Sequence, residues 1–137
     1  MNELKRTVPT SFDEVRARIP EALKTEGFGV LTEIDVQETM KKKLGADFRR
    51  YRILGACNPP LAKQALDADL DVGRFLPCNV VVYENDDGGT TVLAIDPTTT
   101  IAAAKGDARL QSLADDVRAR LERVLERLPA RAERRTS

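Results

Sequence analysis

The chain has 137 residues, of which 42% are apolar and 32% charged, a mixture that supports one hydrophobic core and is unlike that of disordered chains. Its 22 basic and 22 acidic side chains give a formal net charge of zero, which argues against a broad surface for nucleic acid. Apolar stretches fall short of the roughly 18 residues of a membrane span, and the N-terminus lacks the apolar run of a signal peptide. We therefore expect a cytoplasmic protein that has no membrane partner and keeps its two cysteines reduced.

The first segment predicts a short strand followed by a helix. Residues 5–9 are compatible with the strand. Ser11 and Glu14 form a capping box at the start of the helix, in which each side chain can bond the backbone amide of the other residue. Pro20 removes one backbone donor inside the helix, and Gly27 can supply the left-handed residue that ends it.

Two further strands are predicted around a short helix. Residues 28–36 alternate between apolar and polar side chains, which indicates a half-buried strand. Asp35 and Glu38 then repeat the capping pattern at the start of the short helix, and Gly45 ends it. Residues 50–57 form the next strand.

The middle of the chain predicts a helix and a hairpin. Asn58-Pro59-Pro60 starts the helix, with a capping residue followed by proline where the missing amide costs nothing, and the helix reaches about Leu70. Residues 78–83 and 91–95 are rich in β-branched side chains and flank the turn residues 85–89. This pattern is typical of an antiparallel hairpin with a longer loop.

The last element is a long amphipathic helix of roughly 30 Å. Asp107 caps its start, Pro129 follows its end, and its apolar stripe consists of Leu110, Leu113, Val117, Leu121, Val124 and Leu128. The order of elements predicts an α+β fold, with a single mostly antiparallel β-sheet and helices packed on it. We expect one domain over residues 1–129 and a frayed basic tail over residues 130–137.

Most enzyme motifs are absent from the sequence. The chain contains no histidine, which excludes Ser-His-Asp and Cys-His catalysis and the usual imidazole metal sites. Gly27-Phe28-Gly29 lacks a third glycine and opens a strand rather than a helix, so it is not a dinucleotide fingerprint. A catalytic role is therefore uncertain, and the sequence leans away from an enzyme.

Two Cys-Asn pairs beside prolines are the candidate site. We take Cys57, Asn58, Cys78 and Asn79 as candidate ligand-binding residues, and the two cysteines as a candidate site for a soft metal such as Cu(I). A helix N-terminus after Cys57 could also lower the pKa of its thiol. The alternative is that both cysteines are small core residues. If the two strands are antiparallel, the end of one lies near the start of the next and the thiols could meet. If a parallel crossover joins the strands, the cysteines lie at opposite sheet ends, and the sequence leaves this choice open.

The basic residues and the last helix each have two interpretations. Lys41-Lys42-Lys43 and the arginines of the last helix are interpreted as solvated helix faces, with weak nucleic-acid contact as the less favoured alternative. The apolar stripe of the last helix is interpreted as core, with a dimer seam as the alternative.

Three blocks of the sequence resemble a known prokaryotic family. Residues 27–36, 53–59 and 76–82 are similar, in that order and spacing, to the family catalogued as domain of unknown function 302 (DUF302). The resemblance covers about residues 12–97 and differs at Arg74-Phe75, where a more apolar approach is typical. It implies a compact α+β domain that usually stands alone and is dimeric, and it implies no activity.

Three functions follow from these observations. The favoured one is a module that binds a small ligand or a soft metal near the two Cys-Asn pairs; the sequence does not identify a cofactor. The second is a non-catalytic interaction module that acts as a homodimer. The third is a Cys-dependent redox or acyl-transfer enzyme, which ranks last because a nucleophilic cysteine needs a base and no histidine is present.

Overall fold

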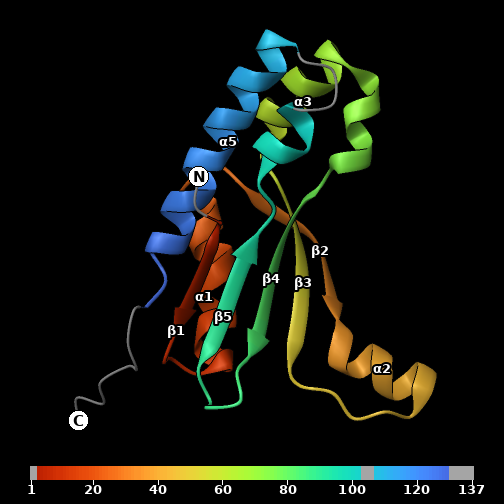
Figure 1. Ribbon diagram of the computed structural model, residues 1–137, viewed down its shortest axis with the longest axis vertical. Helices are drawn as coiled ribbons and strands as arrows, with labels where there is room; N and C mark the ends of the chain where they lie inside the picture. Colours follow the sequence, from red (N-terminus) through yellow and green to blue (C-terminus); the bar gives the residue numbers. More distant parts are fainter. Residues whose placement is uncertain (1–2, 103–106, 130–137) are drawn as a thin grey trace.

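One five-stranded antiparallel sheet organises the molecule, with strand order β1-β5-β4-β3-β2 (Figure 1). The computed structural model describes residues 3–102 and 107–129, so the predicted basic tail lies outside the described residues. The strands are β1 (Lys5–Val8), β2 (Gly29–Asp35), β3 (Tyr51–Cys57), β4 (Cys78–Glu84) and β5 (Thr90–Ala94). The helices are α1 (Phe12–Lys24), α2 (Val36–Leu44), α3 (Pro59–Ala68) and α5 (Ala108–Glu126), with the 3-10 helices η1 (Leu70–Phe75) and η2 (Pro97–Thr99).

The local signals in the sequence place most helix ends correctly. The side chain of Ser11 accepts from the amide of Glu14 at the start of α1, and Asp107 caps α5. Gly27 and Gly45 both have positive φ, as the predicted helix ends require. The helix after Asn58 is shorter than predicted, because α3 ends at Ala68 and the chain continues as the 3-10 helix η1.

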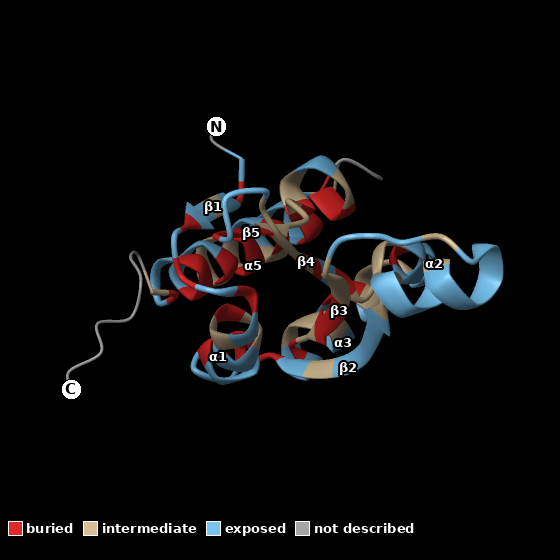
Figure 2. Ribbon diagram, turned by 90° about the horizontal axis from the view of Figure 1, so that it is seen from below, coloured by how far each residue is buried: buried red, intermediate tan, exposed pale blue. Residues whose placement is uncertain are grey.

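The main core lies between one face of the sheet and the helices α1 and α5. Its strand residues alternate with residues on the other face, and its helix residues form the two apolar stripes (Figure 2). The largest fully buried members are Ile19, Leu23, Leu54, Leu121, Val15, Val80, Val82, Val92 and Val124. The stripe of α5 is therefore core, and the alternative of a dimer seam along this helix is wrong.

The strand predicted over residues 28–36 is confirmed as β2, but its predicted half burial is wrong for most of its residues. This strand is a sheet edge, and Leu31 and Ile34 are 64% and 49% exposed. The register with β3 shifts between Val30 and Thr32, which leaves Leu31 in a bulge. Periodicity predicts which residues share a face, but the neighbours that cover each face are a tertiary property.

The arginines of α5 are also not simply a solvated face. Arg118 is buried and forms an ion pair with Asp96, while Arg120 donates to the backbone oxygen of Glu26 over 3.0 Å. At the other end of α5, Arg6 of β1 donates to the carbonyl of Leu125. These contacts use the positive charges to hold α5 in place, which further weakens a nucleic-acid role.

Candidate functional site

The antiparallel pairing of β3 and β4 brings the two cysteines to the same end of the sheet. Ala56 is the register partner of Cys78, so Cys57 is the next residue along the neighbouring strand. The strands are therefore antiparallel, and the arrangement with the cysteines at opposite sheet ends is excluded. The intervening residues form α3 and η1, which return the chain to the same end without a parallel crossover.

Both cysteines line an apolar cavity between the strand ends, α3 and α5. The cavity measures about 30 Å³, which leaves room for little more than one water-sized group. Four of its wall residues are alanines on β3, α3 and α5, whose short side chains leave the space unfilled. The lining consists of Phe28, Ala56, Cys57, Asn58, Leu61, Ala62, Ala65, Leu76, Cys78, Ile101, Leu113, Ala114 and Val117.

The Cys78 thiol is buried and is held in its neutral form. Burial raises the pKa of Cys78 from 9.0 to about 11, and the nearby Cys57 contributes to the rise. A thiol with this pKa is almost wholly protonated near neutral pH, so it behaves as a small apolar group rather than as a nucleophile.

Asn58 lines the same cavity, but its amide is already used by the fold. Its side-chain oxygen accepts from the amide of Leu61 over 3.3 Å and so caps α3. Its side-chain nitrogen donates to the carbonyl of Glu26 over 3.1 Å. The predicted role of Asn58 in orienting a ligand therefore competes with two structural hydrogen bonds.

Asn79 does not join the other three predicted residues. It is exposed on β4 opposite Gly55, on the other face of the sheet from Cys78. The alternation of side chains along a strand separates neighbouring residues in this way. The two Cys-Asn pairs thus resemble each other in sequence but are not equivalent in the structure.

A polar network that the sequence did not reveal fixes the wall of the cavity. The carboxylate of Glu26 accepts two hydrogen bonds from Arg123, at 3.1 and 2.9 Å. The hydrogen bonds from Arg123, together with its charge and those of Arg120 and Arg127, lower the pKa of Glu26 below its usual 4.5, against an opposing effect of burial. Since the carbonyl of Glu26 also binds Asn58, this residue ties α5 to the start of α3.

Sequence reasoning missed Glu26 and the alanines of the cavity wall. Nothing in the local pattern around Glu26 distinguishes it from a surface carboxylate. The alanines carried a usable signal, because Ala65 and Ala114 occupy inward positions of amphipathic helices where larger apolar residues are usual.

The described residues contain neither a metal-binding cluster of three or more side chains nor a helix that could span a membrane. Within residues 3–102 and 107–129, no group of three or more Cys, Asp or Glu side chains is placed to hold a metal ion. Among the helices in the same part of the chain, none is long and apolar enough to cross a membrane.

The fold and the cavity define a small α+β domain with an antiparallel sheet, and the comparisons identify its family. The family model described as domain of unknown function DUF302 matches residues 4–128, so the chain belongs to the DUF302 family. This match extends the resemblance of residues 12–97 to nearly all of the described chain.

A solved structure confirms this assignment. The chain is 38% identical to an uncharacterised conserved DUF302 protein from Bacillus stearothermophilus, whose crystal structure superimposes with a TM-score of 0.84. The likeness covers 94% of this chain and 99% of that one. The search of curated proteins found no match.

Proposed function

We propose that the domain binds the apolar end of a small molecule in the cavity that Cys57 and Cys78 both line. The observation that supports this proposal is the apolar lining of the cavity, which three of the four predicted residues share. The volume of about 30 Å³ suits a small apolar group and leaves the rest of a larger molecule outside.

The wall chemistry supports recognition by shape rather than by hydrogen bonds. Thiols are soft and polarisable, and the neutral Cys78 offers contact without charge. The amide of Asn58 is occupied by the cap of α3 and by Glu26. A polar or charged group in this space would lose its hydration without compensation.

A soft metal is the less favoured ligand for the same residues. Cu(I) would bind Cys57 and Cys78 as thiolates. The raised pKa of Cys78 opposes formation of the thiolate, so the metal would have to compensate for the desolvation of that charge.

Filling the cavity tests the proposal. Ala114→Leu adds bulk to the wall, whereas Ala17→Leu makes the same change at an exposed position of α1. We expect xenon under pressure to shift the methyl NMR signals of Leu61 in the wild type and in Ala17→Leu, but not in Ala114→Leu. Equal shifts in all three proteins, or none in the wild type, would overturn the proposal.

Substitution of the cysteines tests their part in the site. Cys78→Ser places a hydroxyl in an apolar wall, so we expect xenon binding to weaken while the far-UV circular dichroism of the folded domain is retained. Native mass spectrometry of the protein from its own cells then reports any bound mass. A mass equal to that of copper, lost in the double Cys57→Ser, Cys78→Ser variant, would favour the metal over an apolar molecule.

The two alternative functions are a Cys-dependent enzyme and a homodimeric interaction module. The neutral state of Cys78 counts against thiolate catalysis at that position.

A homodimer is supported by exposed apolar side chains outside the core, such as Ile34 and Leu44, and we infer that the domain acts as a homodimer through that surface. The stripe of α5 is excluded as the seam because Leu121 is buried within one chain.

A further inference from the structure

Helix α2 contributes no buried residue to the core. None of its nine residues is buried, and it extends beyond the edge of the sheet on the side opposite α1 (Figure 2). Its apolar residues Val36, Met40 and Leu44 share one face, and Leu44 is 73% exposed. Val36 and Met40 are half-buried, so this face is only partly covered within one chain, and a helix this short gains most of its stability from packing.

The face of the sheet that α1 and α5 leave uncovered carries a continuous aliphatic row. Ile34 pairs with Ile53, Ile53 with Val81, and Val81 with Leu93, so the row crosses four neighbouring strands. Their neighbours along the strands, Leu54, Val80, Val82 and Val92, face the core. We call the row of Ile34, Ile53, Val81 and Leu93 the open-face row.

An aromatic cluster extends the open-face row toward α2. The rings of Tyr51 and Tyr83 stack with centroids 5.4 Å apart, and Phe48 lies 6.0 Å from Tyr51. Phe48 is 42% exposed. Apart from Phe48 and Ile34, the aromatic and aliphatic side chains of this patch are half-buried, and a partly exposed patch of such side chains is typical of the centre of a protein interface.

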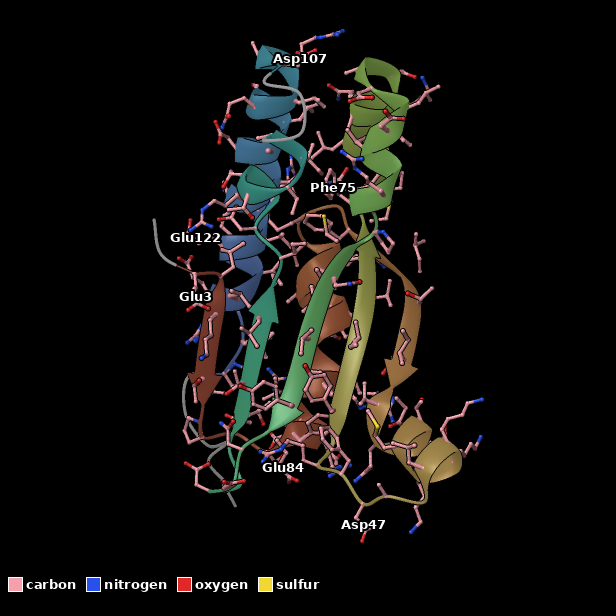
Figure 3. The ribbon with its side chains drawn as sticks, turned by 45° about the vertical axis from the view of Figure 1, so that its right-hand side comes forward. Glu3, Asp47, Phe75, Glu84, Asp107 and Glu122 are labelled. Carbon is pink, nitrogen blue, oxygen red and sulfur yellow. The ribbon has the colours of Figure 1, made fainter. Side chains whose placement is uncertain are left out.

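Exposed charges of opposite sign lie beside this patch, so two copies of it could pair their charges. The last turn of α2 carries Lys41, Lys42 and Lys43, and the turn between β4 and β5 carries Asp86 and Asp87, all of them exposed. Figure 3 shows that this end of the sheet, marked by Asp47 and Glu84, lies opposite the end marked by Phe75 and Asp107. Basic and acidic groups therefore flank the open-face row at one end.

We propose that a second copy of the chain covers the open-face row, with a two-fold axis parallel to the strands. This axis puts like ends together and carries the α2 of each copy across to the β4–β5 turn of the other. Lys41, Lys42 and Lys43 of one copy then meet Asp86 and Asp87 of its partner. This surface specifies where the homodimer inferred above would form.

The present ion pairs of these residues do not compete strongly with such contacts. Lys41 pairs with Asp47, Lys42 with Glu38 and Arg49 with Asp86, through side chains that are all more than a third exposed. Exposed pairs of this kind contribute little and exchange partners readily. Association through the edge of β2 is less suitable, because the bulge at Leu31 interrupts the row of free backbone groups.

The first test places one charge inside or outside the patch. Ile34→Asp introduces a carboxylate at the open-face row, whereas Leu70→Asp makes a comparable change on η1, at the other end of the molecule. We expect sedimentation equilibrium to show a wild-type dimer that Ile34→Asp weakens by about tenfold or more and Leu70→Asp leaves unchanged. Equal effects of the two variants would overturn this surface, and a wild type that stays monomeric would overturn the homodimer itself.

The second test asks whether the charged segments meet between copies. One variant changes Lys41, Lys42 and Lys43 to Glu, and the other changes Asp86 and Asp87 to Lys. We expect each variant alone to dimerise more weakly, since its like charges meet across the axis. When the two are mixed, every contact pairs opposite charges, so native mass spectrometry should show mixed dimers above the statistical half. A purely statistical mixture would overturn the proposed axis.

Neither test depends on the cavity, so both are independent of the ligand proposal.

Discussion

The two faces of the sheet differ in what covers them, although the same strands build both. On the face toward α1 and α5, Leu54 and Val80 are each 1% exposed. On the open face, the adjacent residues Ile53 and Val81 remain partly exposed. β-Branched and aliphatic composition therefore does not by itself distinguish core from surface in this chain. Of two adjacent apolar residues in one strand, one is therefore packed in the core and the other is partly accessible to solvent.

The largest expected effect separates these neighbours directly. Leu54→Ala should lower the free energy of unfolding by about 2–5 kcal/mol, because it leaves a void in the packed core. Ile53→Ala, at the next position, should cost about 1 kcal/mol or less in the monomer. Urea denaturation at protein concentrations below the dimer range measures both, and similar losses would contradict the division between the faces.

The second prediction concerns the cysteine on the covered face. With a pKa of about 11, Cys78 should react with iodoacetamide at pH 8 on the order of a hundredfold more slowly than an unstructured cysteine. Its rate should continue to rise with pH up to about 11. Mass spectrometry of the Cys57→Ser variant isolates this thiol. Rapid alkylation at pH 8 in the folded protein would restore the case for thiolate chemistry.

The third prediction compares the two asparagines, which lie on opposite sides of this division. Asn58→Ala removes the cap of α3 and the bond to Glu26, so we expect a loss of about 1–2 kcal/mol in unfolding free energy. Asn79→Ala changes an exposed side chain and should stay within about 0.5 kcal/mol of the wild type. Chemical denaturation measures both variants. A larger loss for Asn79→Ala would show a structural role for the open face.

The smallest expected effect is a dependence on pH. Since folding lowers the pKa of Glu26, its ionised form stabilises the protein above pH 4.5, and this stabilisation is lost as the pH falls through the lower pKa of the folded state. Glu26→Gln should therefore be less stable than the wild type at neutral pH, with the difference shrinking below pH 4.5. Thermal unfolding across this range measures it, with Glu122→Gln, an exposed change on α5, as the control. A constant difference at all pH values would contradict the assignment.

Much of the fold followed from local signals in the sequence. The caps at Ser11 and Asp107, the left-handed glycines and the apolar stripe of α5 were all predicted from residue type and spacing. The family was identified from three short blocks, and the match over residues 4–128 confirms it. The caps, the left-handed glycines and the helix stripe depend on residues close in the chain, which is why the sequence reveals them.

The candidate site was predicted only in part. Cys57, Asn58 and Cys78 line one cavity, while Asn79 lies on the other face. Alternation along β4 separates Asn79 from Cys78 and could have been read from the sequence, whereas only the direction of β4 relative to β3 decides that Cys57 and Cys78 lie at the same end of the sheet. Asn58 and Arg123 both form hydrogen bonds with Glu26, over separations of 32 and 97 positions in the chain. No local pattern encodes such contacts.

Local interactions set the elements, most of their ends and the class of fold, because hydrogen-bonded caps and apolar periodicity act over a few residues. Only the tertiary structure decided that β2 is an exposed edge, that α5 is core rather than a seam, and that the two cysteines share a cavity. These outcomes depend on strand order and on which surfaces cover one another. Burial is a property of pairs of distant segments, so it emerges only when the whole chain has folded.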